Sequence, residues 1–93
     1  MARDPGIGNR VVATVKSIKG TCSAGHQVGD SFELCGHNSD GLCGFFYHDI
    51  FADIVMMQMG GGYPWSQNKD LMLRGCRDRN NQVELELHRL PRT

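Results

Sequence analysis

The cysteines and histidines of this chain are the residues whose types and spacing best support a chemical site. Cys22 and His26 lie four positions apart in the glycine-containing loop 20–30, "GTCSAGHQVGD". Cys43 directly precedes a segment with helical spacing, and Cys76 follows a predicted strand. Three thiolates and one imidazole satisfy the four positions of a tetrahedral zinc site. We therefore predict Cys22, His26, Cys43 and Cys76 as metal ligands.

The identity of the metal stays open between zinc and iron, because both accept sulfur and imidazole ligands. An iron–sulfur cluster is less favoured, since clusters usually come with more closely spaced cysteines. No Cys-x-x-Cys pair occurs, so the spacing is not that of a zinc finger. His37 and His48 are alternative imidazole ligands. The alternative to any site is that the cysteines are small buried residues that never meet. We predict that Cys35, within a strand, only fills space in the core or on the surface.

Cys43 also suits a second chemistry, that of a nucleophile. The N–H groups and the positive dipole end of the following helix would stabilise a thiolate at this position. His26 would then act as the base, with Asp49 or Asp78 nearby. A structural subunit without any chemistry is the third alternative. Whether the chain is an enzyme is left open by these residues.

Composition excludes several classes of partner. Ten Lys and Arg residues balance ten Asp and Glu residues, so the formal net charge is +0 and no field attracts nucleic acid or anionic lipid. The longest apolar run, "IFADIVMMQM", is about half as long as a membrane-spanning helix needs to be. The N-terminus has no pattern typical of an export signal, so we expect a cytoplasmic protein with reduced cysteines.

The elements that must position these residues follow from the hydrophobic pattern. We predict residues 1–9 as a flexible leader and residues 10–93 as a single domain. Alternation with a period of two predicts four strands, over residues 10–18, 30–36, 70–76 and 82–90. In the last two strands, the residues expected to face the core are Leu71, Leu73, Val83, Leu85 and Leu87.

A change of period to about 3.6 predicts one helix over residues 44–59, which "GGG" at 60–62 ends with a left-handed C-cap. The element order is therefore β-β-α-β-β. Since one helix accompanies four strands, we predict an α+β fold in which a four-stranded, mainly antiparallel sheet carries the helix on one face.

The predicted helix is apolar on more than one side. Its main apolar arc consists of Phe46, Tyr47, Ile50, Phe51, Ile54 and Met57, and the opposite side carries His48, Asp49, Ala52 and Asp53. Phe45, Met56 and Met59 nevertheless cluster within about 60° on that polar side. This patch predicts a second contact, either to another protein, in a homo-oligomer or with a different partner, or to the "YPW" loop at 63–65 folding back.

Three segments resemble a family of small, uncharacterised bacterial and archaeal proteins of about this length: "TCSAGHQVGDSFEL", "GLCGFFYHDIFADIVMMQMGGGYPW" and "LMLRGCRDRNNQVELELHR". By this resemblance Cys22, Cys43 and Cys76 occupy the three cysteine positions of the family. His26 matches a Cys-x-x-x-His form found in part of it. Arg79 stands where a glycine commonly follows the Cys-x-Asp turn. The resemblance implies a shared site but no reaction.

These observations favour a small cysteine and histidine metal-binding module, acting as an accessory subunit, as the function of the chain. The first alternative is a small thiol-dependent enzyme or redox protein that uses Cys43. The second is a non-catalytic subunit that binds other proteins through the helix patch.

Overall fold

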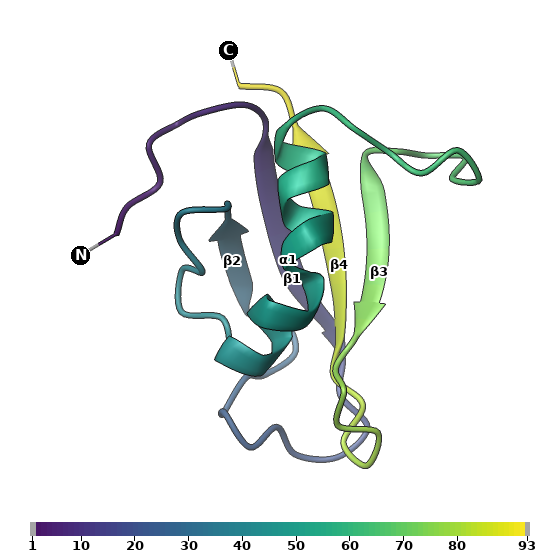
Figure 1. Cartoon of the computed structure of the whole chain (residues 1–93). Coiled ribbons are helices and arrows are strands. Elements are labelled where there is room, and N and C mark those ends of the chain that lie inside the picture. Colours follow the sequence, from purple (N-terminus) through teal and green to yellow (C-terminus); the bar gives the residue numbers. More distant parts are fainter. Residues whose placement is uncertain (1, 93) are drawn as a thin grey trace.

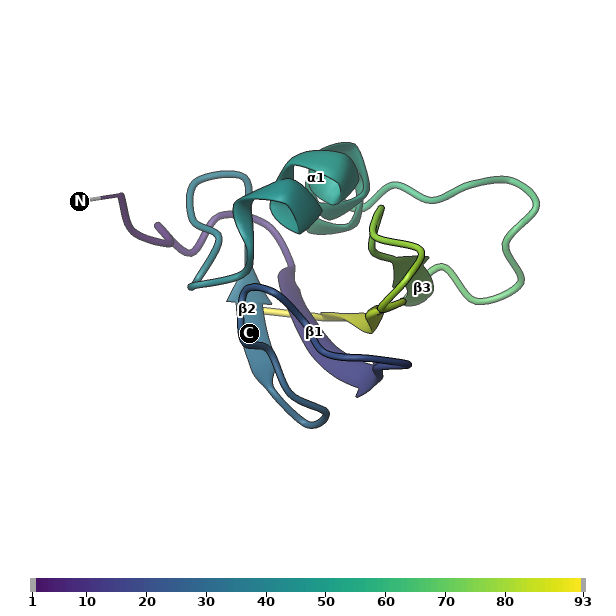
Figure 2. The same ribbon diagram turned by 90° about the horizontal axis from the view of Figure 1, so that it is seen from below.

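The computed structural model describes residues 2–92. Its elements are β1 (Arg10–Ser17), β2 (Ser31–Leu34), α1 (Gly44–Gln58), β3 (Leu71–Gly75) and β4 (Glu84–Leu90). The strands form one sheet in the order β2-β1-β4-β3, and every neighbouring pair is antiparallel. The single helix α1 lies across one face of this sheet, which gives two layers (Figures 1 and 2). The predicted α+β fold with the order β-β-α-β-β is confirmed.

The core lies between the helix and the sheet. Alternate residues of β1, from Val11 to Val15, are buried, and Leu85 and Leu87 of β4 are also buried. From the helix, side chains spaced three or four residues apart reach the same core: Phe46, Ile50, Ile54 and Met57. The period of two in the strands and the period of about 3.6 in the helix therefore each place one apolar face toward the core.

Strand β3 presents the face opposite to the one predicted. Met72 is buried, whereas Leu73 is 46% exposed and Leu71 is half-buried. The register explains the difference, because Met72 pairs with the inward Leu87 of β4 and directly paired residues share a face. The expectation that Leu71 and Leu73 face the core was wrong.

Asp53 is also placed differently from its predicted position on the polar side of the helix. Asp53 is only 9% exposed. Its carboxylate accepts hydrogen bonds from the Tyr63 hydroxyl at 2.7 Å and from Arg74 Nε at 2.8 Å. The loop that follows α1 is thereby attached to Asp53. It leaves the side chains of Phe45 and Met59 65% and 60% exposed, so it does not cover the whole helix patch.

The helix ends at the predicted glycines. Gly60 has a φ of +88°, its N–H donates to the Met57 carbonyl, and the Gly61 N–H donates to the Met56 carbonyl. This is the pair of bonds that defines a Schellman C-cap. The buried Gln58 side chain, in the last turn, donates to the Ile7 carbonyl and accepts from the Gly36 N–H.

The connectivity brings three chain segments to one end of the sheet. β1 and β3 are both antiparallel to β4, so they run in the same direction and finish at the same end. The helix α1 begins at that end too, near the lower edge of Figure 1. Within residues 2–92, no helix has the length and apolar character needed to span a membrane.

Candidate functional site

One pocket at this end of the sheet is lined by three of the four cysteines, Cys22, Cys43 and Cys76. The pocket has a volume of about 360 Å³. Its remaining lining consists of Ser23, Ala24, Phe45, Arg77, Asp78, Asn81 and Val83. We refer to it as the thiol pocket. All three cysteines are half-buried, with free thiols.

Cys22 is held near the pocket by bonds between its loop and the turn after β3. The N–H groups of Lys19 and Gly20 both donate to the Asn81 carbonyl, and the Thr21 N–H donates to Asn81 Oδ1 at 3.0 Å. A Cβ atom on Gly20 would lie 2.2 Å from Asn81 Oδ1. A side chain at position 20 would therefore displace the Asn81 amide and break its bond to the Thr21 N–H.

Cys76 begins the turn that carries Asn81. The Asp78 N–H donates to Cys76 Sγ at 3.4 Å. The Asp78 carboxylate accepts bonds from Asn81 Nδ2 and from the N–H groups of Asn80 and Asn81, and these bonds lower its pKa. Asp78 thus lines the pocket, but its carboxylate already accepts three bonds that organise the turn.

Cys43 is the N-cap residue of α1. The helix has no side-chain cap and no acidic residue in its first turn, so nothing from these positions offsets the positive end of its dipole. The Cys43 N–H donates to His26 Nε2 at 3.0 Å, and the imidazole packs edge-on against Phe32 at a centroid distance of 4.9 Å. His26 therefore contacts the backbone of Cys43 and is not among the residues that line the thiol pocket.

Arg77 supplies the positive charge beside the pocket. Its Nε donates to Asp49 Oδ2 at 2.8 Å, and its guanidinium lies 5.0 Å from the centre of the Phe45 ring. The hydrogen bond from Arg77, with a second one from His48, lowers the pKa of Asp49 to about 2. Asp49 is therefore an ionised partner of Arg77 near neutral pH, which disfavours it as a general base.

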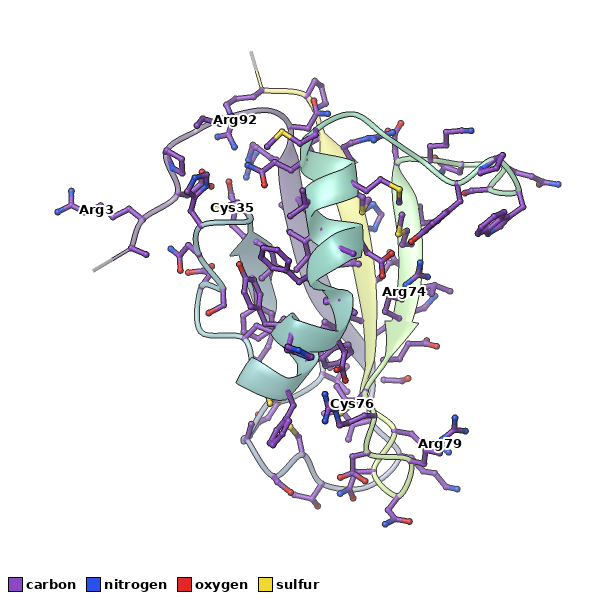
Figure 3. All side chains as sticks on the ribbon, viewed as in Figure 1. Arg3, Cys35, Arg74, Cys76, Arg79 and Arg92 are labelled. Atoms are coloured by element: carbon purple, nitrogen blue, oxygen red, sulfur yellow. The ribbon has the colours of Figure 1, made fainter. Side chains whose placement is uncertain are left out.

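The remaining thiol and two histidines lie outside this site. Cys35 is 1% exposed and makes an isolated bridge with Asn38, and its carbonyl accepts a bond from the Tyr47 hydroxyl at 2.6 Å. Figure 3 places Cys35 by the end of β2 and Cys76 at the far end of the molecule. The side chain of His48 is 81% exposed, and His37 is exposed.

The three thiols surround a common space without forming a coordination shell. Among residues 2–92, no group of three or more His, Cys, Asp or Glu side chains is arranged so that it could hold a metal ion as it stands. A pocket of about 360 Å³ is within the range of small-ligand sites. The three cysteines can therefore bind a soft metal ion only if the thiols move toward one another. The pocket can also admit a small electrophile that a thiolate attacks.

Sequence reasoning did not single out Phe45, Arg77 and Asn81 as parts of the site. Arg77 has one signal that could have revealed it, its position directly after Cys76. Asn81 has none, because its role depends on a loop about sixty residues earlier in the chain. A scan against protein-family models, a search of curated proteins and a search of solved structures found no match to the chain.

Proposed function

We propose that the thiol pocket binds a thiophilic divalent metal ion, zinc or ferrous iron, through the thiolates of Cys22, Cys43 and Cys76. The observation that carries the proposal is that these three cysteines, from three separate segments, line one pocket. The fourth cysteine, Cys35, is buried elsewhere. Three sulfur ligands are typical of sites for zinc and iron.

The loop that carries Cys22 is the part of the site that can close around an ion. Gly25 has a φ of +88° and open space around it, and residues 23–25 are exposed. The segment before Cys22 is fixed to Asn81. Cys22 would move toward Cys43 and Cys76 by a rearrangement of this turn, in which the Gly25 N–H donates to the Cys22 carbonyl at 3.0 Å, and the sheet would stay in place.

The charges around the pocket suit three thiolates and a divalent ion. Such a complex carries one net negative charge, and the Arg77 guanidinium lies next to it. The positive end of the α1 dipole lies at Cys43, and the Asp78 N–H donates to Cys76 Sγ. Hydrogen bonds of this kind to ligand atoms are what tune and orient a metal site.

We assign His26 a positioning role in this site. Its Nε2 already accepts the Cys43 N–H, so coordination through Nε2 would break the bond that fixes the start of α1. A site with three protein ligands leaves one position for water or a small substrate, which is the arrangement of catalytic zinc sites.

The metal proposal is tested with cobalt, whose thiolate complexes absorb visible light. We expect the reduced chain to bind about one Co²⁺ with sulfur-to-metal charge-transfer bands. Replacing Cys22, Cys43 or Cys76 by serine should weaken binding by roughly 100-fold or more, because even an outer-shell substitution costs 10–100-fold. Elemental analysis of untagged protein, purified without chelator, then identifies the native metal.

Two control variants make this test specific. Cys35→Ala removes the buried thiol and should leave the cobalt spectrum and affinity unchanged. His26→Gln should retain the charge-transfer bands, because it removes no proposed ligand. If Cys35→Ala abolished binding, or if all three serine variants bound cobalt like the parent chain, the proposed site would be refuted.

The second candidate function is thiol chemistry at Cys43, which is favoured by its place at an otherwise uncapped helix start. In the metal-free chain, iodoacetamide should then alkylate Cys43 at least about tenfold faster than Cys22 and Cys76, which are half-buried like Cys43, as measured by peptide mass spectrometry. A metal-free native chain with one fast thiol supports this candidate. A native chain that holds one metal, with three thiols protected from alkylation until chelator is added, supports the metal site.

The helix patch supports an association with another protein, in keeping with an accessory subunit. The side chains of Phe45 and Met59 are 65% and 60% exposed, and exposed apolar side chains that lie together usually mark a contact surface. Phe45 also lines the thiol pocket. A protein bound to this patch would therefore lie beside the proposed metal site.

A further inference from the structure

The outward face of α1 carries an apolar stripe. At about 100° per residue, Phe45, Ala52, Met56 and Met59 lie along one side of the helix. Ala52 is exposed, like Phe45 and Met59, and Met56 is half-buried. The opposite side of the helix already forms the core. A helix that is apolar on both sides is normally covered on both, so the stripe requires an occupant.

The surroundings of the stripe are neutral. The helix contains no Lys or Arg. Its two carboxylates are paired within the chain, Asp49 with Arg77 and Asp53 with Arg74. The chain has a formal net charge of +0. Two copies of this surface can therefore meet without repulsion between like charges.

The two ends of the stripe lie at equal distances from Ala52, because Phe45 and Met59 are each seven positions from it. Met56 has no counterpart within the stripe, since the position four residues before Ala52 is the polar His48. In an antiparallel pair of helices with a two-fold axis at Ala52, Phe45 of one copy would face Met59 of the other. Contacts between methionine sulfur and an aromatic ring are favourable, the small alanines permit a close crossing, and antiparallel helix dipoles attract.

The two ends of the stripe differ in form. At its N-terminal end lies a shallow groove of about 690 Å³, lined by Ala24, Cys43, Gly44, Phe45, His48 and Arg77. At its C-terminal end the Met59 side chain projects into solvent. A two-fold interface uses the same patch on both copies and requires such self-complementarity.

We propose that the occupant is a second copy of this chain, packed antiparallel through α1, with each Met59 filling the groove of the other copy. The inference rests on the contact surface proposed above and names its partner. Because Cys43, Phe45 and Arg77 line both the groove and the thiol pocket, the second copy covers one side of the proposed metal site. A single helix face buries less than the roughly 800 Å² per partner of a standard interface, so the dimer is weak.

Sedimentation velocity over about 5 to 500 μM tests the dimer. We expect the parent chain to shift from monomer toward dimer as its concentration rises. Ala52→Arg should stay monomeric, because two guanidinium groups would meet on the two-fold axis and repel each other. Ala52→Glu should also stay monomeric, because two carboxylates would meet there. An equal mixture of the two variants should associate again, since opposite charges then face each other on the axis.

Gln67→Arg is the matched control, because it adds the same charge at an exposed position outside the stripe, and it should dimerise like the parent. A parent chain that stays monomeric throughout would overturn the inference, as would a mixture of Ala52→Arg and Ala52→Glu that fails to associate. Cobalt absorbance recorded on the same samples separates the two proposals. A monomer that binds cobalt contradicts the dimer and leaves the metal site standing.

Discussion

Among single residues, Asp53 is a buried carboxylate that joins separate segments of the chain. Its carboxylate, on α1, contacts Tyr63 from the following loop and Arg74 from β3. Burial opposes ionisation of this carboxyl, but the hydrogen bonds from Arg74 and Tyr63 outweigh burial and lower its pKa. The ionised carboxylate therefore holds three segments together.

We expect Asp53→Asn to destabilise the fold by roughly 1–3 kcal/mol at pH 7, because a partly buried Arg74 loses its partner. A lowered folded pKa means that this stabilisation is complete above the unfolded pKa of about 3.9. It is lost as the pH falls through the folded value. Urea unfolding at pH 7, 5 and 3 measures the free energy of unfolding of the parent chain and of Asp53→Asn. The difference between these two free energies should become smaller only at pH 3.

Asp70→Asn is the matched control for that substitution. Asp70 also pairs with an arginine, Arg89, but the Asp70 side chain is 67% exposed. The more buried Arg89 keeps its hydrogen bonds to the Met57 and Gly61 carbonyls without Asp70, so the loss of Asp70 should change the free energy of unfolding by only about 0.5 kcal/mol. Equal effects of the two substitutions, or a difference for Asp53→Asn that grows below pH 4, would contradict this account of Asp53.

At the scale of elements, the end of α1 depends on the left-handed backbone of Gly60. A Cβ atom there would meet no neighbour within 4 Å, so a substitution tests the backbone conformation alone. Gly60→Ala should cost about 1 kcal/mol, and Gly60→Asn should cost less because asparagine tolerates this conformation. Thermal unfolding of the two variants provides the measurement.

Gly44→Ala is the control at the other end of the helix. Gly44 has open space around it and no positive φ, so alanine should be neutral or slightly stabilising there. If Gly60→Ala were as stable as the parent chain, the Schellman C-cap would contribute nothing to the stability of this helix.

At the scale of the whole molecule, the proposed metal joins the loop after β1, the start of α1 and the end of β3. A ligand that binds only the folded chain stabilises it by about 2.7 kcal/mol at 100 times its dissociation constant. For a domain of this size we expect zinc to raise Tm by roughly 10–20 °C. Calorimetry should show this rise for the parent chain and for Cys35→Ala, and no rise for Cys43→Ser.

The element order could be predicted from the sequence because each signal is local. The alternation of Val11, Ala13 and Val15 indicates a strand with one buried face. The 3.6-residue period from Phe46 to Met57 indicates a helix, and the glycines at 60–62 mark its end. Each of these patterns is set by backbone geometry within a few residues, so the fold class follows from them.

The positions of single side chains could be predicted less well. Leu73 lies on the open face because β3 pairs with β4 in a register that local alternation does not specify. Asp53 is buried because Arg74 reaches it from a strand about twenty residues later. Both errors concern contacts between elements, for which the spacing within one element carries no signal.

From the amino-acid pattern alone, Cys22, Cys43 and Cys76 were expected beside periodic segments and Cys35 inside a strand, whereas Cys35 in fact follows the end of β2. The three-dimensional fold was needed to show that the first three line one pocket, that Cys35 is buried apart from them, and that Arg77 and Asn81 lie beside the pocket. The physical reason is that β1 and β3 run in the same direction on either side of β4. Strand order, which no local pattern encodes, brings their ends to the start of α1.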